Sequence, residues 1–345
     1  MIVGIYYGSS SSDSQENVIM NSIWKRVSSV GLVVAFLATL LMSFPLISAA
    51  PPDKCEPWPE CKDGEEPPAD PAIAFCQSNR IWVMNDDGSN QAVVFEGYFG
   101  YNSLSWSPDA KSLAWSGYKY VPNVPGYDHG VWRIDVNVVD GEPQGSNLQR
   151  LVTPPGEDHY IGGAAWSPLG DEIAYMVRIS DTESGIDAVP ATGGTPYRIY
   201  TSPDGFGVLA GSDVTWRSDG SRLAFISVEI SVARSIMIID RATGTVTHSL
   251  LTGQFHFSGL DWAQGVDSLI FDDGNSGMIY TVDIGTETAE PVVTGSLPSW
   301  SPDNSKIVYQ QQLNRRKHKI STYEFSTGDI TPLAKGPARS DWRRF

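Results

Sequence analysis

One short motif recurs along the chain and constrains its fold more than any other feature. A strand-like segment that ends in Trp is followed by a tight turn of the Ser-Pro-Asp type and a second apolar segment, as in LPSWSPDNSKIVY. Similar copies read SLSWSPDAKSLAW, AAWSPLGDEIAY and VTWRSDGSRLAF, with a fainter copy, LDWAQGVDSLIF, and a half copy, RSDWRRF. The repeated Trp are separated by roughly 40 to 60 residues, a period typical of propeller blades that contain several strands each. These residues are Trp106, Trp166, Trp216, Trp262, Trp300 and Trp342.

The second strands of the repeat predict the number of blades. Six such segments occur, namely AIAFC, SLAWS, EIAYM, RLAFI, SLIFD and KIVYQ. The first lacks a Trp strand before it, and the strand around Trp342 has no second strand after it. We therefore expect an all-β, six-bladed β-propeller over residues 71–345, in which the C-terminal strand completes the first blade and closes the ring.

Composition supports this fold and limits the partners. The chain has 11 Trp, 33 Gly and 23 Pro with only 19% charged residues, which favours many short strands joined by tight turns. Its formal net charge of -16 argues against nucleic acid, which is usually bound by a basic surface.

The N-terminal region has the order of a targeting segment. Lys25 and Arg26 precede an uncharged run whose apolar centre, 31–42, is followed by the small residues Ser48, Ala49 and Ala50. We expect residues 20–50 to be a secretory signal peptide cleaved after Ala49, with an uncleaved membrane anchor as the alternative. Residues 1–19 form an upstream extension, so the chain is expected to start at Met20.

Residues 51–70 form a Pro-rich, acidic tether without apolar periodicity. Outside the cytosol, Cys55 and Cys61 could close a small disulfide loop and leave Cys76 unpaired in a strand. Two Cys without a further Cys pair or a nearby His do not suggest a zinc site, so we expect no metal and no cofactor.

The repeat carries a family resemblance. The segment IAFCQSNRIWVMNDDGSNQAVVFEG, followed by SLSWSPDAKSLAW, resembles the TolB-like, WD-related β-propeller repeat, and the likeness extends over roughly residues 71–345. The third unit departs from the pattern with WSPLGDE, and the fifth, with WAQGVDS, lacks the Ser-Pro pair. The resemblance implies a secreted six-bladed propeller whose relatives mostly bind other proteins, and it does not imply an enzyme.

Two classes of enzyme also contain propellers of this kind. Propellers also gate prolyl-oligopeptidase-like hydrolases, but the chain has no G-x-S-x-G nucleophile elbow and no residues for a hydrolase domain after the propeller. Some similar propellers are lyases that act on acidic sugars through a metal held by several His in the channel. The five His here form no HxH or HxxxH pair, although blade symmetry could bring distant residues together.

Propeller geometry predicts where a binding site would lie. The loops that enter the innermost strands surround one mouth of the channel, and mixed aromatic, amide and ionisable groups there suit peptide or small-ligand recognition. The alternative is that His159 and His256 are ordinary loop residues, whereas the repeated Trp are expected to pack between blades. The residues predicted at this mouth are Tyr101, Asn102, His159, Tyr160, Ser212, Asp213, Phe255, His256, Ser296 and Arg339.

Two further segments could contact a partner. The basic run NRRKHK, with Arg315, Arg316 and Lys317, is expected in a loop of the last blade, either as a solvated hairpin tip or as a docking surface for an acidic partner or anionic lipid. The insertion GYKYVPNVPGYDHG is expected to be a semi-rigid binding loop or a cover for the neighbouring blade. Its three tyrosines are Tyr118, Tyr120 and Tyr127.

The two DDG runs, 86–88 and 272–274, lack EF-hand spacing and are expected to be turns without calcium. We thus expect a non-catalytic, monomeric protein-binding scaffold in the periplasm or outside the cell. Its partner would be another envelope or extracellular protein, and it would touch a membrane only through an N-terminal anchor. The alternative is a carbohydrate-active propeller, either sugar-binding or a metal-dependent lyase of acidic oligosaccharides.

Overall fold

The computed structural model describes residues 71–97, 103–120, 127–154, 156, 159–180, 183–203, 206–208, 213–229, 233–314, 317–336 and 339–342. The predicted signal segment, the extension before it and the tether lie outside these residues, as do Cys55 and Cys61. No helix in the described part of the chain is long and apolar enough to cross a membrane.

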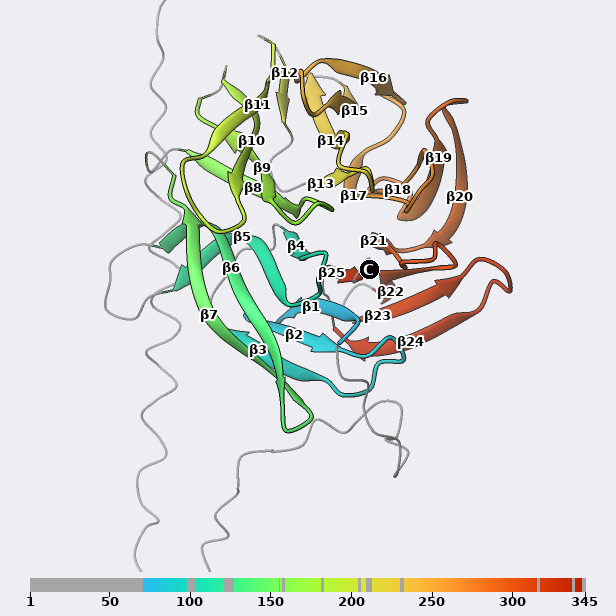
Figure 1. The fold of residues 1–345 in the computed structure, drawn as a ribbon. Helices are drawn as coiled ribbons and strands as arrows, with labels where there is room; N and C mark the ends of the chain where they lie inside the picture. Colours follow the sequence, from blue (N-terminus) through green and yellow to red (C-terminus); the bar gives the residue numbers. More distant parts are fainter. Residues whose placement is uncertain are drawn as a thin grey trace, which may run out of the picture. The chain divides into compact units, whose positions relative to one another are not determined.

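Six antiparallel sheets surround a common centre, which confirms the predicted all-β, six-bladed propeller (Figure 1). In each blade the strands are ordered from the centre of the ring outward. The innermost strand of blade 4 is divided into β12 and β13, which both pair with β14.

The strands of each blade, from the innermost outward, have the following bounds. Blade 1 contains β25 (Arg339–Trp342), β1 (Ile73–Gln77), β2 (Arg80–Met84) and β3 (Ala92–Glu96). Blade 2 contains β4 (Ser103–Trp106), β5 (Ser112–Tyr120), β6 (Tyr127–Val139) and β7 (Glu142–Val152). Blade 3 contains β8 (Tyr160–Trp166), β9 (Glu172–Arg178), β10 (Ser184–Pro190) and β11 (Tyr197–Thr201). Blade 4 contains β12 (Phe206–Val208), β13 (Val214–Trp216), β14 (Arg222–Glu229), β15 (Arg234–Asp240) and β16 (Val246–Leu250). Blade 5 contains β17 (Phe257–Trp262), β18 (Ser268–Asp273), β19 (Met278–Asp283) and β20 (Thr288–Thr294). Blade 6 contains β21 (Ser296–Trp300), β22 (Lys306–Asn314), β23 (Lys317–Glu324) and β24 (Ile330–Lys335).

The ring is closed by strands from the two ends of the described chain. β25 pairs with β1 in a register that runs from Ile73 opposite Trp342 to Cys76 opposite Arg339. β25 therefore supplies the innermost strand that blade 1 lacks, as the repeat count predicted. Cys76 is a free, buried thiol in β1, and burial raises its pKa to about 12.

The repeated Trp fill the spaces between blades. Each of the six apolar cores contains one repeated Trp together with residues of the preceding blade: Trp106 packs with Cys76 and Ile81 of blade 1, and Trp342 with Val308 of blade 6. All six indoles are at least nine-tenths buried. The predicted packing role of these residues is confirmed, and it explains the repeat, since each blade needs one large apolar side chain at this position.

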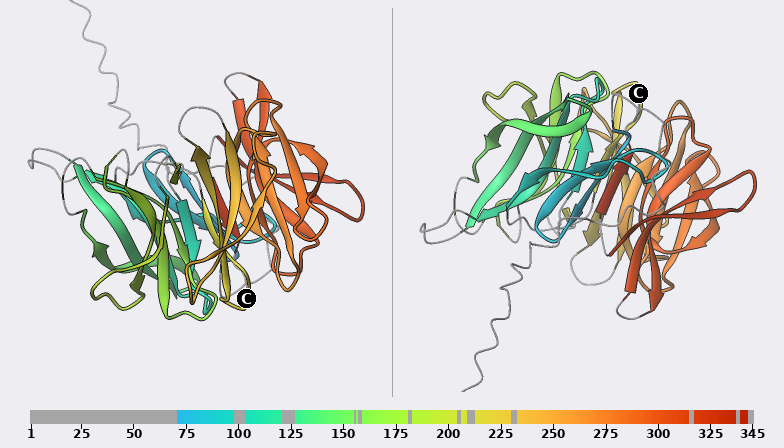
Figure 2. Two further views of the ribbon diagram at one scale, coloured as in Figure 1. Left: turned by 90° about the horizontal axis from the view of Figure 1, so that it is seen from above. Right: turned by 90° about the horizontal axis from the view of Figure 1, so that it is seen from below.

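Strand direction divides the connections between two faces of the ring. Each innermost strand ends at its Trp, so the turn to the second strand and the turn from the third to the fourth strand lie on one face, here called the turn face. The connections from second to third strand and from blade to blade lie on the opposite face, the mouth face. The edge-on views in Figure 2 show the strands of the blades running between these two faces.

The Ser-Pro-Asp turns are stabilised by their own side chains. In blade 6, Ser301 Oγ accepts a hydrogen bond from the Lys306 amide at 2.9 Å and donates one to Asp303 Oδ1 at 2.7 Å, while that carboxylate accepts the Ser305 amide at 3.0 Å. These local bonds satisfy backbone groups that the strands leave unpaired at the turn.

The insertion in blade 2 is more regular than the loop we expected. β5 and β6 remain paired from Gly117 opposite Gly130 out to Tyr120 opposite Tyr127, and residues 121–126 lie outside the described chain. The segment is therefore a lengthened β-hairpin, because the alternating Tyr and polar residues on both sides suit a paired strand.

Candidate functional site

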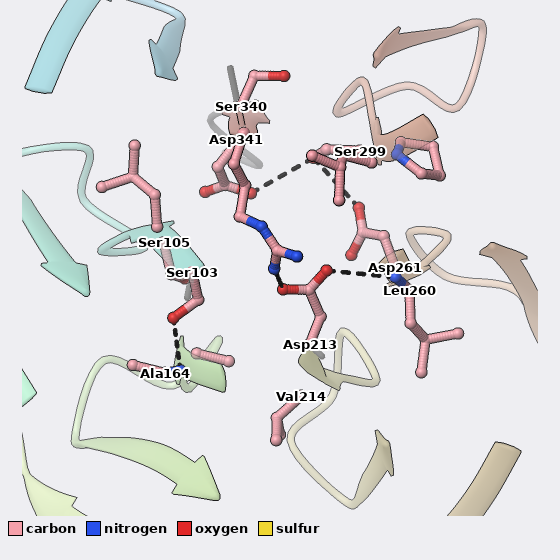
Figure 3. Close-up of a pocket in the computed structure, with 15 residues that line it drawn as sticks. Ser103, Ser105, Ala164, Asp213, Val214, Leu260, Asp261, Ser299, Ser340 and Asp341 are labelled. Atoms are coloured by element: carbon pink, nitrogen blue, oxygen red, sulfur yellow. Dashed lines mark hydrogen bonds and ion pairs between the residues drawn. The ribbon is translucent and has the colours of Figure 1, made fainter. Parts of the chain in front are cut away.

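The central channel is lined by two repeat positions of the innermost strands. Because strand side chains alternate, the residues one and three positions before each Trp share a face opposite the indole. The position three before Trp is occupied by Ser103, Gly163, Asp213, Gly259, Leu297 and Arg339, and the position one before it by Ser105, Ala165, Thr215, Asp261, Ser299 and Asp341. Most of these residues line a single small cavity on the channel axis (Figure 3).

An ion pair crosses this channel. The guanidinium of Arg339, the first residue of β25 in blade 1, bonds to the Asp213 carboxylate, directly before β13 in blade 4. Both side chains are largely buried, with 9% and 19% of their surfaces exposed, respectively. Asp213 Oδ2 also accepts a hydrogen bond from the Leu260 amide of blade 5 at 3.3 Å. One pair thus connects the closing strand to the far side of the ring (Figure 3).

The environment of Asp213 opposes its ionisation. Burial is the main cause that raises the pKa of Asp213 to about 6, and the nearby carboxylates of Asp272 and Asp261 act in the same direction. Arg339 and the Leu260 amide lower this pKa but only partly offset burial. Burial also raises the pKa of Asp272, whose carboxylate accepts bonds from the Gly259 amide at 2.6 Å and the Leu297 amide at 3.2 Å.

Between the ion pair and the turn face, hydrogen bonds join neighbouring blades. These bonds are called the belt below. In five of the six interblade steps, the side chain one position before the Trp of one blade accepts a hydrogen bond from the backbone amide of the Trp in the next blade. The Trp106 amide donates to Asp341 Oδ2 (2.9 Å), Trp166 to Ser105 Oγ (3.0 Å), Trp262 to Thr215 Oγ1 (3.1 Å), Trp300 to Asp261 Oδ2 (2.9 Å) and Trp342 to Ser299 Oγ (3.2 Å).

The sixth step lacks this bond. Ala165 of blade 3 occupies the belt position and has no side-chain acceptor for the Trp216 amide. The contact between these blades is made instead by the Trp216 indole N–H, which donates to the Ala165 carbonyl at 3.1 Å. The belt is therefore polar and continuous except between blades 3 and 4.

The remaining space in the channel is small. The cavity measures about 40 Å³, enough for a few water molecules, whereas pockets for drug-sized ligands measure roughly 300 Å³ or more. No group of three or more His, Cys, Asp or Glu side chains in the described residues is placed to hold a metal ion. Asp261 and Asp341 instead use their carboxylates as acceptors in the belt.

The predicted mouth residues separate into several environments. Asp213 and Arg339 meet in the channel, as described above. His256 is exposed, and its Nδ1 lies 3.1 Å from a guanidinium nitrogen of Arg234. The Tyr160 ring lies 5.8 Å from the ring of His129, whose Nε2 is 2.9 Å from the Ile161 carbonyl oxygen.

The other predicted contact residues lie at the periphery or outside the described chain. His159 is half-buried before β8, and Ser296 and Phe255 are half-buried at the entrances to β21 and β17. Lys317 is exposed as the first residue of β23, opposite Asn314 of β22, so it lies in the paired hairpin of blade 6 rather than in the loop that we expected. Tyr118, Tyr120 and Tyr127 are described only by their backbone pairing, and the remaining predictions, Tyr101, Asn102, Ser212, Arg315 and Arg316, lie outside the described residues.

The sequence interpretation missed the belt residues. Asp261, Ser299 and Asp341 stand directly before a repeated Trp, and the prediction assigned the whole motif to packing and turns. Superposing the repeats on their Trp would have shown a small or acidic polar residue at this position in every blade but the third.

The comparisons with known proteins agree with this architecture. A protein of Agrobacterium tumefaciens described as a TolB matches with a TM-score of 0.54 and 18% sequence identity over 78% of this chain and 90% of that one. TolB from Acinetobacter baumannii matches with a TM-score of 0.57 and 17% identity over 79% of this chain and 66% of that one. No family model matches the sequence, and no curated protein matches it significantly. The chain thus has a TolB-like six-bladed propeller fold, and the likeness extends to the fold alone.

Proposed function

We propose that the protein is an exported, non-catalytic β-propeller that binds another protein of the cell envelope or the extracellular space through its mouth face. The observation that carries the proposal is the filled channel. The Asp213–Arg339 pair crosses it, the belt occupies its walls, and the space left is about 40 Å³. A partner would therefore meet the outer surface of the ring rather than enter it.

Rigidity of the ring supports a scaffold role. Six interblade cores, five belt bonds and the closure of β25 on β1 fix the blades relative to one another. Hairpins such as β5–β6 are consequently presented in a preset arrangement, so little conformational entropy is lost when a partner binds. Export remains a prediction from the basic, apolar and small residues of the N-terminal segment.

The carbohydrate-active alternative has weaker support. Three carboxylates line the channel, those of Asp213, Asp261 and Asp341, and an acid/base pair could in principle use such groups. However, each of them already accepts a hydrogen bond or an ion pair from the protein, and the cavity has no room for a sugar ring together with a catalytic water.

The proposal can be tested by affinity capture from envelope extract of the protein's own source. The full chain with a C-terminal tag would be crosslinked, and the retained material identified. We expect one protein in a fixed ratio that binds the chain again after separate purification, with a dissociation constant of about 1 µM or lower. A matched variant would join Gly117 to Gly130 through a two-residue turn, which tests whether the lengthened hairpin takes part. Retention or shortening of glycans without any protein partner would overturn the scaffold proposal and favour the carbohydrate alternative.

A further inference from the structure

The two faces of the propeller differ in charge because their connections differ in chemistry. On the turn face, Asp side chains bond backbone or hydroxyl groups two or three residues ahead. Asp219 Oδ1 accepts the Ser221 amide at 2.9 Å, Asp240 Oδ1 the Thr243 amide at 2.9 Å, and Asp283 Oδ1 the Thr286 amide at 2.8 Å. These turns recur in most blades, so the turn face accumulates carboxylates as a result of turn formation.

The mouth face of blade 6 has the opposite charge. Lys317 and Lys319 lie on β23, and Lys335 ends β24. These three residues are called the lysine cluster below. Gln77 of blade 1 donates a hydrogen bond to the Lys335 carbonyl, which places the cluster at the junction of blades 6 and 1.

The arrangement of the lysine cluster is unfavourable for the isolated fold. Lys319 and Lys335 are direct cross-strand partners in the β23–β24 ladder, and like charges at opposed positions destabilise a sheet. All ion pairs among the described residues use arginines, so none joins these lysines to an acidic side chain there. A repulsive pair without a counterion within the described fold suggests that an anionic group comes from outside.

The lysine cluster can act locally despite the net charge of -16. Strand β23 has 8 residues, so its ends are roughly 25 Å apart at a rise of about 3.3 Å per residue. The Debye length at physiological ionic strength is about 8 Å, so the acidic turn face at the other end is largely screened. An acidic partner would thus be attracted to the lysine cluster and find no similar attraction at the turn face.

We propose that the lysine cluster is the docking site for an acidic segment of the partner protein. This inference rests on the proposed function, and it adds the face and the chemistry of the contact. A protein segment fits better than a lipid surface because the same face also carries the exposed carboxylate of Glu183. A flat anionic membrane would meet this group as well, whereas a peptide strand along β23 and β24 would not.

The test compares two charge-matched variants of the full chain. Lys319→Gln with Lys335→Gln removes the opposed pair of charges from the lysine cluster, and Lys111→Gln with Lys306→Gln removes the same amount of charge from the turn face. Binding of a fluorescent dodeca-glutamate peptide would be measured by anisotropy over a series of salt concentrations, with dodeca-lysine as the peptide control. Vesicles of phosphatidylcholine and phosphatidylglycerol in a 3:1 ratio would be measured in parallel.

We expect wild type and the turn-face variant to bind dodeca-glutamate alike, and the cluster variant to bind about tenfold more weakly with a shallower salt dependence. Equal losses in both variants, no binding by wild type, or preference for the vesicles would each overturn the inference. Affinity capture separates the two proposals: a partner still retained by the cluster variant refutes the docking site and leaves the scaffold function intact. Capture of glycans alone by wild type refutes the scaffold function itself.

Discussion

Asp213 and Arg339 occupy the same repeat position in opposite blades. Each stands three residues before a repeated Trp, in blades 4 and 1 of the six-membered ring, and their side chains meet across the channel. Since Arg339 begins the strand that closes the ring, this contact joins the closing strand to the blade farthest from it. The pair is buried, so its effect on stability depends on whether both partners are present.

Removing Arg339 alone should cost more than removing both partners. Arg339→Met leaves the buried Asp213 carboxylate without its cation, whereas Asp213→Asn replaces a carboxyl whose ionisation burial opposes. At pH 7.5 we expect Arg339→Met to lower the free energy of unfolding by about 3 kcal/mol, and the double variant with Asp213→Asn to lower it by clearly less. Urea unfolding of the four proteins followed by Trp fluorescence measures this. Additive losses would contradict the proposed coupling.

The Asp213 carboxyl should make stability depend on pH between about 4 and 6. Its pKa is about 6 in the folded protein and 3.8 for the unperturbed group, so the folded state binds the proton more tightly. A raised folded pKa contributes stability that is complete below the lower value and is lost as the pH rises through the higher one. Relative to Asp213→Asn, wild type should therefore lose about 2 kcal/mol of stability between pH 4 and pH 7. Unfolding curves of both proteins across this range check the sign, and a constant difference would refute it.

The sequence predicted the fold well because the repeat is set by packing. Each interblade core needs a large apolar residue at one strand position, so the Trp recur and reveal the blade number. The unmatched Trp342 strand at one end and the unmatched second strand near Ala72 at the other made the ring closure predictable as well.

The site was only partly predictable. Asp213 and Arg339 were both placed at the channel mouth, but their pairing depends on blades 1 and 4 facing each other, which a linear sequence does not display. Asp261 and Asp341 were missed because their role requires a partner in the next blade, about 40 or more residues away along the chain. The Tyr insertion was expected to be a loop because its Pro and Gly residues favour turns, and cross-strand pairing made its flanks regular.

A serine at position 165 should supply the belt hydrogen bond that is missing between blades 3 and 4. Ser at this position would place a hydroxyl where Ser105 and Ser299 place theirs, within reach of the Trp216 amide. We expect Ala165→Ser to raise the free energy of unfolding by about 1 kcal/mol, the typical net value of one hydrogen bond. The matched variant Ser105→Ala, which removes the bond to the Trp166 amide at 3.0 Å, should lower it by about the same amount. Urea unfolding measures the change in free energy for both variants. Loss of stability in Ala165→Ser would mean that the site has no room for the hydroxyl.

Replacing Ala110 with glycine should stabilise the folded protein. It adopts a φ of 57° in the turn after Trp106, whereas the equivalent positions in blades 3 and 4 are Gly170 at 79° and Gly220 at 74°. An L-residue in this left-handed region costs about 1 to 2 kcal/mol, and the greater unfolded-state entropy of Gly cancels only part of the gain. We therefore expect Ala110→Gly to stabilise the protein by about 0.5 kcal/mol. Gly170→Ala is the control of opposite sign, since its new Cβ would meet Pro108 Cγ at an ordinary 3.4 Å and the loss would come from φ alone. Thermal unfolding of both variants decides the point, and equal signs for the two changes would show that φ is not the cause.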